Sequence, residues 1–231
     1  MANIINIETS TEVCSVALTS EGQVLEHREN YDGQNHAKLL STFISDVLKY
    51  ATSREIKIDA VAVSIGPGSY TGLRIGLSEA KGLAFGLNVP LIGVDTLKIL
   101  CVATMFRHEI DENALFIPMI DARRMEVFTG VYNLTLKEVM QPHPVILNED
   151  SFSEYINTGK DIYLIGNGAD KAAKILKQPN VKFIKGIKPV AVEMLALSEL
   201  AFRKNDFIDI AYSTPKYLKE FQATTPKHKV I

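Results

Sequence analysis

Residues 59–77 read DAVAVSIGPGSYTGLRIGL, and this stretch decides the fold class. The valine-rich run that ends at Gly66 is apolar without interruption, as in a strand covered on both faces of a sheet. From Thr71 to Leu87 the apolar residues have helical spacing, and Ser69 or Thr71 is positioned to cap the exposed amide groups of this helix. A buried strand that leads directly into a helix is typical of layered α/β proteins.

The elements on either side of this unit complete an α/β half. Residues 3–30 alternate or run apolar and are interrupted by two short polar turns, which predicts three consecutive strands. Residues 35–51 then change period and place their apolar side chains on one side of a helix. Downstream, residues 89–94 predict a strand and residues 96–106 a further helix.

Charge and polarity rise after this half, and we place a lobe boundary there. Residues 1–108 are expected to form an N-terminal lobe, and residues 109–231 a smaller C-terminal lobe with a tail. In the second lobe, residues 115–142 predict three strands and residues 161–178 a strand followed by a helix. Residues 190–205 predict an amphipathic helix. The fold class is therefore α/β, with a mixed sheet and helices in each of two lobes.

The composition excludes several classes of protein. Of the 231 residues, 46% are hydrophobic and 23% charged, which is typical of a folded globular chain. Neither a membrane-spanning run nor a secretory signal is present, so we expect a cytoplasmic protein without membrane contact. The net charge of −2 argues against a protein that holds nucleic acid alone, although residues 216–229 are locally basic. Cys14 and Cys101 lie in apolar stretches and are expected to be buried free thiols.

Two turns could hold a phosphate group. The first predicted hairpin has an acidic residue and three hydroxyls at its tip, Glu8–Thr11, a turn that could bind ATP phosphates and magnesium. Ordinary polar turns use the same residue types, and we favour that interpretation. In GPGSYTGLRIG (residues 66–76) backbone amides at a helix N-terminus could accept an anion. Its glycine spacing matches neither the P-loop nor the G-x-G-x-x-G pattern, so we predict no cofactor-binding residues.

We predict no metal-binding and no catalytic residues. Four residues after His36, where a second helical ligand would stand, the chain has Leu40. A hairpin of the second lobe carries four charged residues, Asp121, Arg123, Arg124 and Glu126. Asp121 could act as a general base beside arginines that clamp a phosphate. We favour a charged turn whose residues pair with each other or with a partner.

The helix at residues 71–87 has a stripe of small residues. Gly72, Gly76 and Ala80 recur every four residues, and a helical glycine costs about 1 kcal/mol relative to alanine. Close approach of another backbone would compensate, either from the first helix of the same chain or from a partner. The apolar arc of the helix at residues 35–51 spans roughly 180°, wider than burial on one side requires. We therefore predict a partner interface at Leu39, Leu40, Phe43, Val47, Gly72, Leu73, Gly76, Leu77 and Ala80.

Five segments together resemble the bacterial TsaB (YeaZ) family over roughly the first 135 residues. They are IETST (7–11), NHAKLL (35–40), SIGPGSYTGLRIGLSEAKGLA (64–84), GVDTL (93–97) and DARRMEVFTGVY (121–132). GPGSYTGLRIG is the most specific of these motifs, and the resemblance is looser in the second half of the chain. The resemblance implies the two-lobed fold of the actin-like ATPases, which is also called the RNase H-like or ASKHA fold.

The resemblance also implies a function in tRNA modification. In such families a TsaD-like catalytic subunit transfers threonylcarbamoyl to the adenosine next to the tRNA anticodon, and TsaB is a required, non-catalytic partner or activator. A TsaE-like ATPase completes the complex, and ATP and metal are expected on these partner subunits. The two N-lobe helices are expected to contact the TsaD-like subunit, or a second copy of the chain in a homodimer. Contact with tRNA would take place through the complex.

Two other functions were weighed against this one. A stand-alone ATP-dependent kinase or acyltransferase of the same fold would use the turn at Glu8. A metallopeptidase would need a bound metal. The resemblance implies that the metal-binding catalytic paralogue has two histidines four residues apart on its first helix, whereas this chain has only His36 there. The short second lobe leaves little room for a complete nucleotide clamp. The partner-subunit function is therefore preferred.

Overall fold

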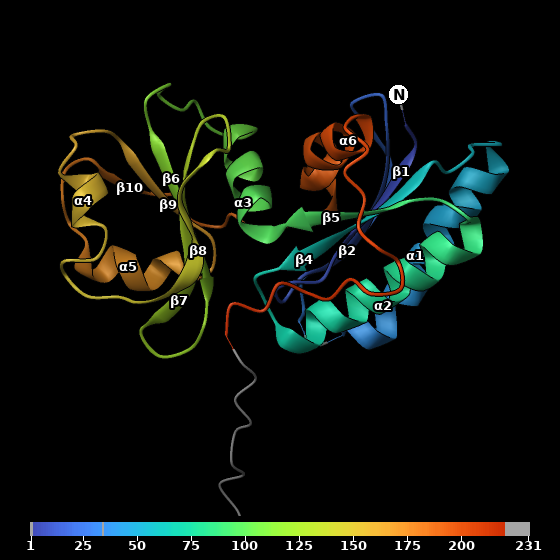
Figure 1. Ribbon diagram of the computed structural model, residues 1–231, viewed down its shortest axis with the longest axis horizontal. Helices are drawn as coiled ribbons and strands as arrows, with labels where there is room; N and C mark the ends of the chain where they lie inside the picture. The colour runs from blue at the N-terminus through green and yellow to red at the C-terminus, as the bar shows by residue number, and fades with distance from the viewer. Residues whose placement is uncertain (1, 34, 220–231) are drawn as a thin grey trace, which may run out of the picture.

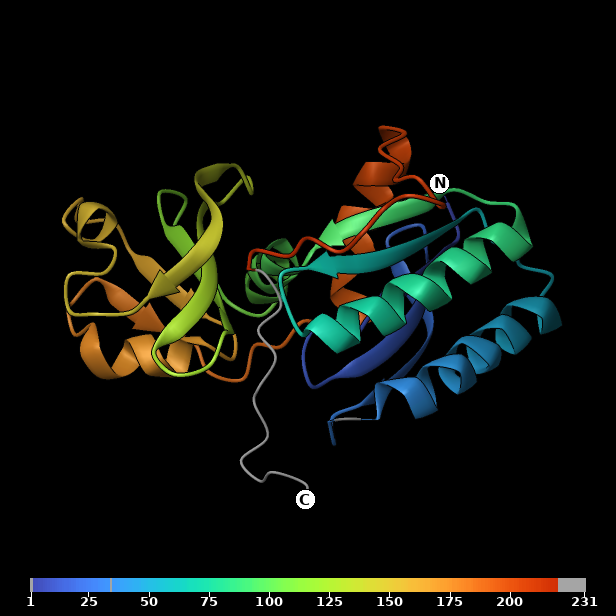
Figure 2. The ribbon, with the colours of Figure 1, turned by 60° about the horizontal axis from the view of Figure 1, so that its bottom comes forward.

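The computed structural model describes residues 2–33 and 35–219, which form two α/β lobes side by side (Figures 1 and 2). Each lobe contains a five-stranded mixed sheet, with the orders β3-β2-β1-β4-β5 and β8-β7-β6-β9-β10. Numbered from the first strand of each lobe, both orders read 3-2-1-4-5. The predicted two-lobed actin-like fold is confirmed.

The N-terminal lobe follows the predicted order of elements. Its elements are β1 (Ile4–Glu8), β2 (Cys14–Ser20), β3 (Gln23–Asn30), α1 (His36–Ser53), β4 (Ala60–Gly66), α2 (Tyr70–Leu87), β5 (Leu91–Asp95) and α3 (Thr96–Met105). The first three strands are antiparallel, whereas β4 and β5 continue the sheet in parallel. In the centre, Ile7 of β1 lies between Val16 and Val63. Successive side chains of each strand point to opposite faces of the sheet, and those on one face are buried under α1 and α2.

The other face of the same sheet is covered by the end of the chain. The 3-10 helix η1 (Ala191–Met194) and helix α6 (Leu195–Arg203) pack there against small side chains such as Ala60 and Ala62. Our assignment of all residues from 109 onward to the second lobe is therefore corrected, because η1 and α6 belong to the core of the first. Figure 1 shows α6 above the N-terminal sheet, away from β6 to β10.

The C-terminal lobe is smaller and shares a helix with the first lobe. Its elements are β6 (Leu115–Asp121), β7 (Glu126–Asn133), β8 (Glu138–Ile146), α4 (Ser153–Ile156), β9 (Ile162–Ile165), α5 (Ala169–Ile175) and β10 (Val181–Phe183). Helix α5 packs on one face of the sheet. The other face packs on α3, where Leu97 and Leu100 contact the cluster around Phe116. On its opposite side α3 buries Ile99 in the N-terminal lobe.

After α6 the chain returns along the N-terminal lobe. We call residues 206–219 the C-terminal strap. Its Ile208 amide donates to the carbonyl oxygen of Leu91 (2.8 Å) at the edge of the sheet. Of the predicted basic tail, only residues 216–219 are among the described residues. Cys14 and Cys101 are buried free thiols, as predicted. Within the described ranges, no helix combines the length and apolarity needed to cross a membrane.

Candidate functional site

The turn after β1 is folded back onto its own acidic residue. Glu8 is fully buried, and its Oε1 accepts hydrogen bonds from the amide and the hydroxyl of Ser10, both at 2.6 Å. Burial raises the pKa of the Glu8 carboxyl from 4.5 to about 7, although the bonds from Ser10 and Ser64 act in the opposite direction.

The same turn is seated in notches formed by glycines. A Cβ atom on Gly68 would lie 2.3 Å from the carbonyl oxygen of Ser10, and one on Gly72 would lie 2.2 Å from that of Thr9. A Cβ on Gly76 would lie 2.1 Å from the hydroxyl of Thr9. The stripe on α2 is thus filled by this chain, and by its first turn rather than by its first helix. The expectation that Gly72 and Gly76 lie at a partner interface is corrected, because both glycines are buried under Thr9.

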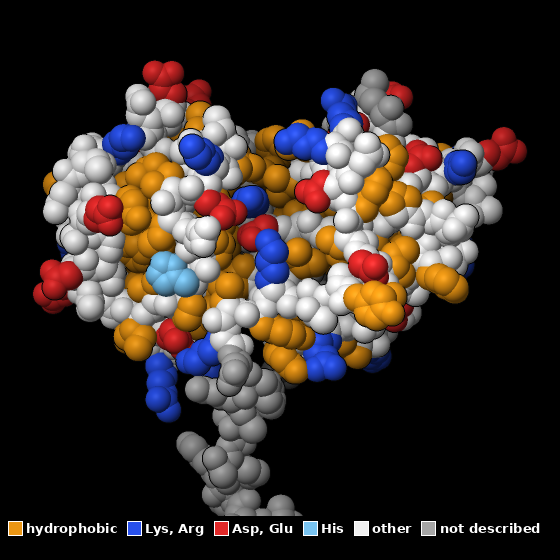
Figure 3. Space-filling view, in the orientation of Figure 1, with side chains coloured by type: hydrophobic (Ala, Val, Ile, Leu, Met, Phe, Trp, Pro, Cys, Tyr) orange, Lys and Arg blue, Asp and Glu red, His pale blue; other side chains and the backbone are white. Residues whose placement is uncertain are grey.

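A cleft of about 950 Å³ separates the two lobes. The β1–β2 turn, the start of α2, the β6–β7 turn and the end of the strap line it. Figure 3 shows hydrophobic side chains on both sides of the boundary between the lobes. Glu12 crosses this boundary, since it pairs with Lys188 (3.2 Å) and accepts a bond from Asn167 (3.4 Å).

Three hydrogen-bond donors at or beside the turn are engaged within the chain. The hydroxyl of Thr9 donates to the carbonyl oxygen of Gly72 (2.9 Å), and the amide of Ser10 is held by Glu8. The amide of Ser69, next to the N-terminus of α2, donates to the carbonyl oxygen of Ser10 (2.7 Å). These three donors are therefore not directed at a ligand, and the two turns touch each other. In the same turn Glu8 Oε2 and Thr11 Oγ1 are buried without a hydrogen-bond partner.

The charged hairpin of the second lobe is paired as a turn. Asp121 accepts a bond from Lys171 (2.8 Å), and its amide donates to Asn167 (2.9 Å). Arg123 and Arg124 both have positive φ, at 72° and 48°. The alternative that we favoured, a charged turn, agrees with these contacts, because Asp121 is engaged by a lysine instead of being free to accept a substrate proton.

His36 has a structural contact at the start of α1. It is buried, and its Nε2 lies 2.8 Å from the carbonyl oxygen of Thr11. In residues 2–33 and 35–219 no group of three or more His, Cys, Asp or Glu side chains is arranged to hold a metal ion. His36 therefore ties α1 to the first turn.

The predicted partner residues divide into two groups. Five belong to the lobe's own core: Leu40, Val47, Leu73, Leu77 and Ala80. A partner would not reach these side chains, so their place in the interface is corrected. Leu39 and Phe43 are half-buried at the edge of that core and remain available in part. Of the residues that the sequence pattern selected on these two helices, most lie on the inner faces.

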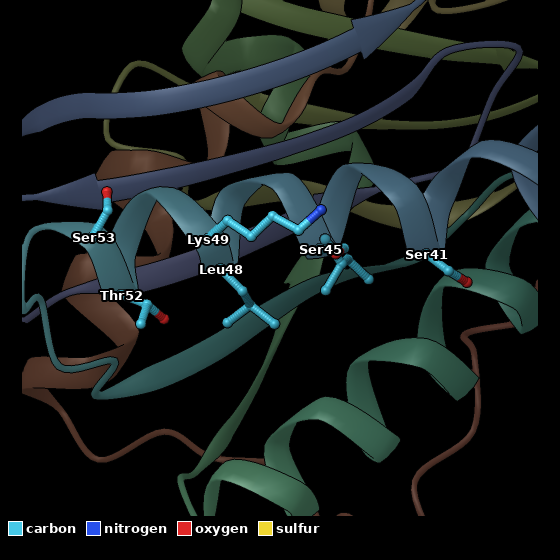
Figure 4. Close-up of a pocket in the computed structure, with 7 residues that line it drawn as sticks. Ser41, Ser45, Leu48, Lys49, Thr52 and Ser53 are labelled. Atoms are coloured by element: carbon cyan, nitrogen blue, oxygen red, sulfur yellow. The ribbon is translucent and has the colours of Figure 1, made fainter.

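The outer face of the two helices has a different small-residue pattern. Gly82 and Gly86 of α2 are exposed, and a Cβ on either would have nothing within 4 Å. Figure 4 shows Ser41, Ser45 and Leu48 on the side of α1 toward α2, where they line a shallow hollow. The hydroxyl of Ser41 donates to Glu79 of α2 (2.7 Å), which joins the two helices there. We call this surface the α1–α2 face.

Phe85 makes the α1–α2 face more apolar. Its side chain is 79% exposed, between the two open glycines of α2. Other large apolar side chains of this chain are also exposed, such as Tyr212 and Ile146, but Phe85 lies beside two bare stretches of helix backbone. Our sequence analysis did not include Gly82, Gly86 or Phe85, although glycines four residues apart in a helix could have indicated them.

Comparisons with known proteins give one consistent result. A family model described as TsaD, tRNA N6-adenosine threonylcarbamoyltransferase, matches residues 24–229. The "tRNA threonylcarbamoyladenosine biosynthesis protein TsaB" of Escherichia coli (strain K12) is 28% identical over 226 residues, 94% of each chain. The protein of that name from Bacillus subtilis (strain 168) is 29% identical over 225 residues, 95% of each chain. The solved structure of YeaZ from Pseudomonas aeruginosa is 28% identical, with a TM-score of 0.80, and the match covers 94% of this chain and 100% of that one.

Proposed function

Because this chain belongs to the TsaD family, among its TsaB (YeaZ) members, we propose that it is a non-catalytic partner subunit in threonylcarbamoyladenosine biosynthesis. It acts beside a TsaD-type catalytic subunit, which transfers threonylcarbamoyl to the adenosine next to the anticodon of tRNA. The resemblance found in the sequence is confirmed by the comparisons. No contact described above favours the stand-alone kinase or acyltransferase.

The open glycines of the α1–α2 face carry the proposal. Gly82 lies inside an 18-residue helix, where a glycine costs about 1 kcal/mol relative to alanine, and Gly86 lies in its last turn. Unlike Gly72 and Gly76, they accommodate nothing in this chain. A second helix can approach such a bare backbone more closely than a surface of larger side chains. Phe85 would supply the buried aromatic anchor that protein interfaces commonly contain.

The contacts of the β1–β2 turn support the non-catalytic part of the proposal. Glu8 is buried and Ser10 is bonded to it, so the residues that would hold a phosphate are engaged with each other. The chain then needs no cofactor of its own, and ATP and metal belong to the partner subunits. We extend the proposal to a TsaE-like ATPase in the same complex, to tRNA contact through that complex, and to a cytoplasmic location. In the absence of the catalytic subunit, the α1–α2 face would pair with a second copy.

Co-purification with the TsaD-type subunit of the same cell tests the proposal. Gly82→Trp places a large side chain on the α1–α2 face at an exposed position where its Cβ meets no atom of this chain, so the monomer should fold normally. We expect its affinity for the catalytic subunit to fall at least tenfold, and tRNA modification in a reconstituted assay to fall with it. Unchanged affinity and activity in Gly82→Trp would contradict the proposed surface.

Two controls make this test specific. Lys174→Trp places the same side chain on exposed α5 of the other lobe and should leave binding intact. A reconstitution without this chain should show little modification. Substitutions at Gly76 are unsuitable here, because they displace Thr9 and report folding rather than docking.

A further inference from the structure

The C-terminal strap is fixed firmly at its beginning. Ile208 and Ile210 pack against the core beneath α1 and α2. The ammonium group of Lys81, on α2, donates to the carbonyl oxygens of Ala211 (3.1 Å) and Ser213 (2.7 Å). Two partly buried isoleucines and a lysine that donates two hydrogen bonds hold this part of the strap on the N-terminal lobe. Figures 1 and 2 show the strap running from α6 along that lobe to the boundary between the lobes.

The end of the strap is held by polar contacts and one stacked ring. The amide of Lys216 donates to the carbonyl oxygen of Ile65 (2.7 Å), at the end of β4. Its ammonium group lies 3.5 Å from the carboxylate of Asp95. The ring of Tyr217 stacks on Tyr70 at the start of α2, with the centroids 4.8 Å apart. Each of these contacts is still made to the N-terminal lobe.

The last described residue crosses to the other lobe. The ammonium group of Lys219 lies 2.8 Å and 3.1 Å from the two carboxylate oxygens of Glu126, on β7. Lys216, Tyr217 and Lys219 all line the interlobe cleft. The strap thus spans the mouth of the cleft and ends in an ion pair on its far side. An ion pair in contact with solvent is weak and is screened by salt, so Lys219 can leave Glu126 while Ile208 and Lys81 hold the beginning of the strap.

We propose that residues 215–219 form a releasable latch across the interlobe cleft. When the latch is docked, Tyr217 lies on Tyr70 and Lys219 holds Glu126, which keeps the C-terminal lobe close to the N-terminal lobe. When it is released, the lobes remain joined by the packing of α3 and by the contacts of Glu12, and the cleft opens further. Since Tyr70 belongs to α2, the latch links this helix to the width of the cleft.

A single tryptophan can report the docked latch. The chain contains no tryptophan, so Tyr217→Trp gives one fluorophore that stacks on Tyr70. In this background, Lys219→Glu places two carboxylates together and should raise the acrylamide quenching constant at least twofold. The exchange Lys219→Glu with Glu126→Lys should restore the original value. Lys204→Glu makes the same charge change at the exposed end of α6 and should have no effect.

A distance measurement tests whether the latch acts on the lobes. Spin labels on cysteines introduced at Lys38 of α1 and Gln141 of β8 lie on exposed sites of opposite lobes, while Cys14 and Cys101 are buried. We expect Lys219→Glu to lengthen and broaden the interlobe distance distribution, and the charge exchange to restore it. An unchanged distribution in Lys219→Glu would overturn the proposal, whatever the quenching shows. Unchanged quenching, or failure of the exchange to restore both readouts, would overturn it as well.

Discussion

The hydroxyl of Thr9 donates a hydrogen bond of 2.9 Å to the carbonyl oxygen of Gly72, one turn before Gly76 on α2. The same hydroxyl occupies the space that a side chain on Gly76 would need. The buried glycines of α2 therefore serve the first turn of their own chain, whereas the exposed glycines further along the helix do not. This difference separates residues needed for folding from residues available to a partner.

Substitutions at the two kinds of glycine should have opposite effects on stability. Gly76→Ala places a Cβ against Thr9 and should lower the free energy of unfolding by about 1–3 kcal/mol. Gly82→Ala meets nothing and should raise it by up to about 1 kcal/mol. Urea denaturation of the isolated chain measures both values. Equal effects of the two substitutions would contradict the packing of Thr9 on α2.

Glu8 should make stability depend on pH. Its folded pKa, about 7, lies above the ordinary value of 4.5, so the unfolded chain releases this proton first as the pH rises. Burial of the Glu8 charge therefore lowers the free energy of unfolding. This loss is absent below about pH 4.5, grows up to about pH 7 and is constant above that, on the order of 3 kcal/mol. Glu8→Gln removes the charge, so its stability relative to the wild type should increase between pH 5 and pH 8.5.

Parallel denaturation curves at the two pH values measure this change. Glu112→Gln, at an exposed position, serves as the control, and its difference from the wild type should stay nearly constant. A constant difference for Glu8→Gln as well would show that Glu8 ionises in the folded chain as it does in the unfolded chain.

Asp95 should stabilise the start of α3. Its Oδ1 accepts bonds from the amides of Leu97 (2.9 Å) and Lys98 (3.4 Å), which have no partner within the helix. Asp95→Ala should therefore cost about 1–2 kcal/mol, and Asp95→Asn, which can also cap a helix, clearly less. Thermal unfolding of the three proteins tests this order, and similar losses for both variants would argue against a capping role.

Leu100 should hold the C-terminal lobe together although it lies on a helix of the first. It is fully buried in the cluster that includes Phe116 and Ile165. Leu100→Ala leaves a cavity there and should cost about 2–5 kcal/mol. Leu200→Ala, at a half-exposed site on α6, should cost much less. Circular dichroism during urea denaturation gives both values, and a small loss in Leu100→Ala would contradict the shared packing.

The sequence predicted the order of elements in the first lobe because each has a clear period. The valine run before Gly66 became β4, and the helical spacing after it became α2. The position of α6 could not be predicted, because an amphipathic pattern shows that one face is buried but not which sheet covers it. The strap escaped prediction for a related reason, since its contacts are largely backbone bonds and single lysines without periodicity.

The candidate surface was predicted at the level of helices and not of side chains. Both Gly76 and Gly82 fit a small-residue pattern, and only tertiary contacts reveal that Thr9 fills one notch and leaves the other open. Leu40 and Val47 appeared available because the apolar arc of α1 is wide, yet the sheet beneath covers them. The breadth of an apolar arc does not tell how much of it the chain itself buries.

Helix α3 has a consequence for how the protein can be divided. Its residues Leu97 and Leu100 complete the core of one lobe, while Ile99 completes that of the other. A fragment that stops at residue 108 would expose the apolar side of α3 to solvent and would lack α6. The complementary fragment would lack the helix that seals its own sheet. Expressed separately, neither piece should be soluble, whereas expressed together in one cell they should assemble as a non-covalent pair.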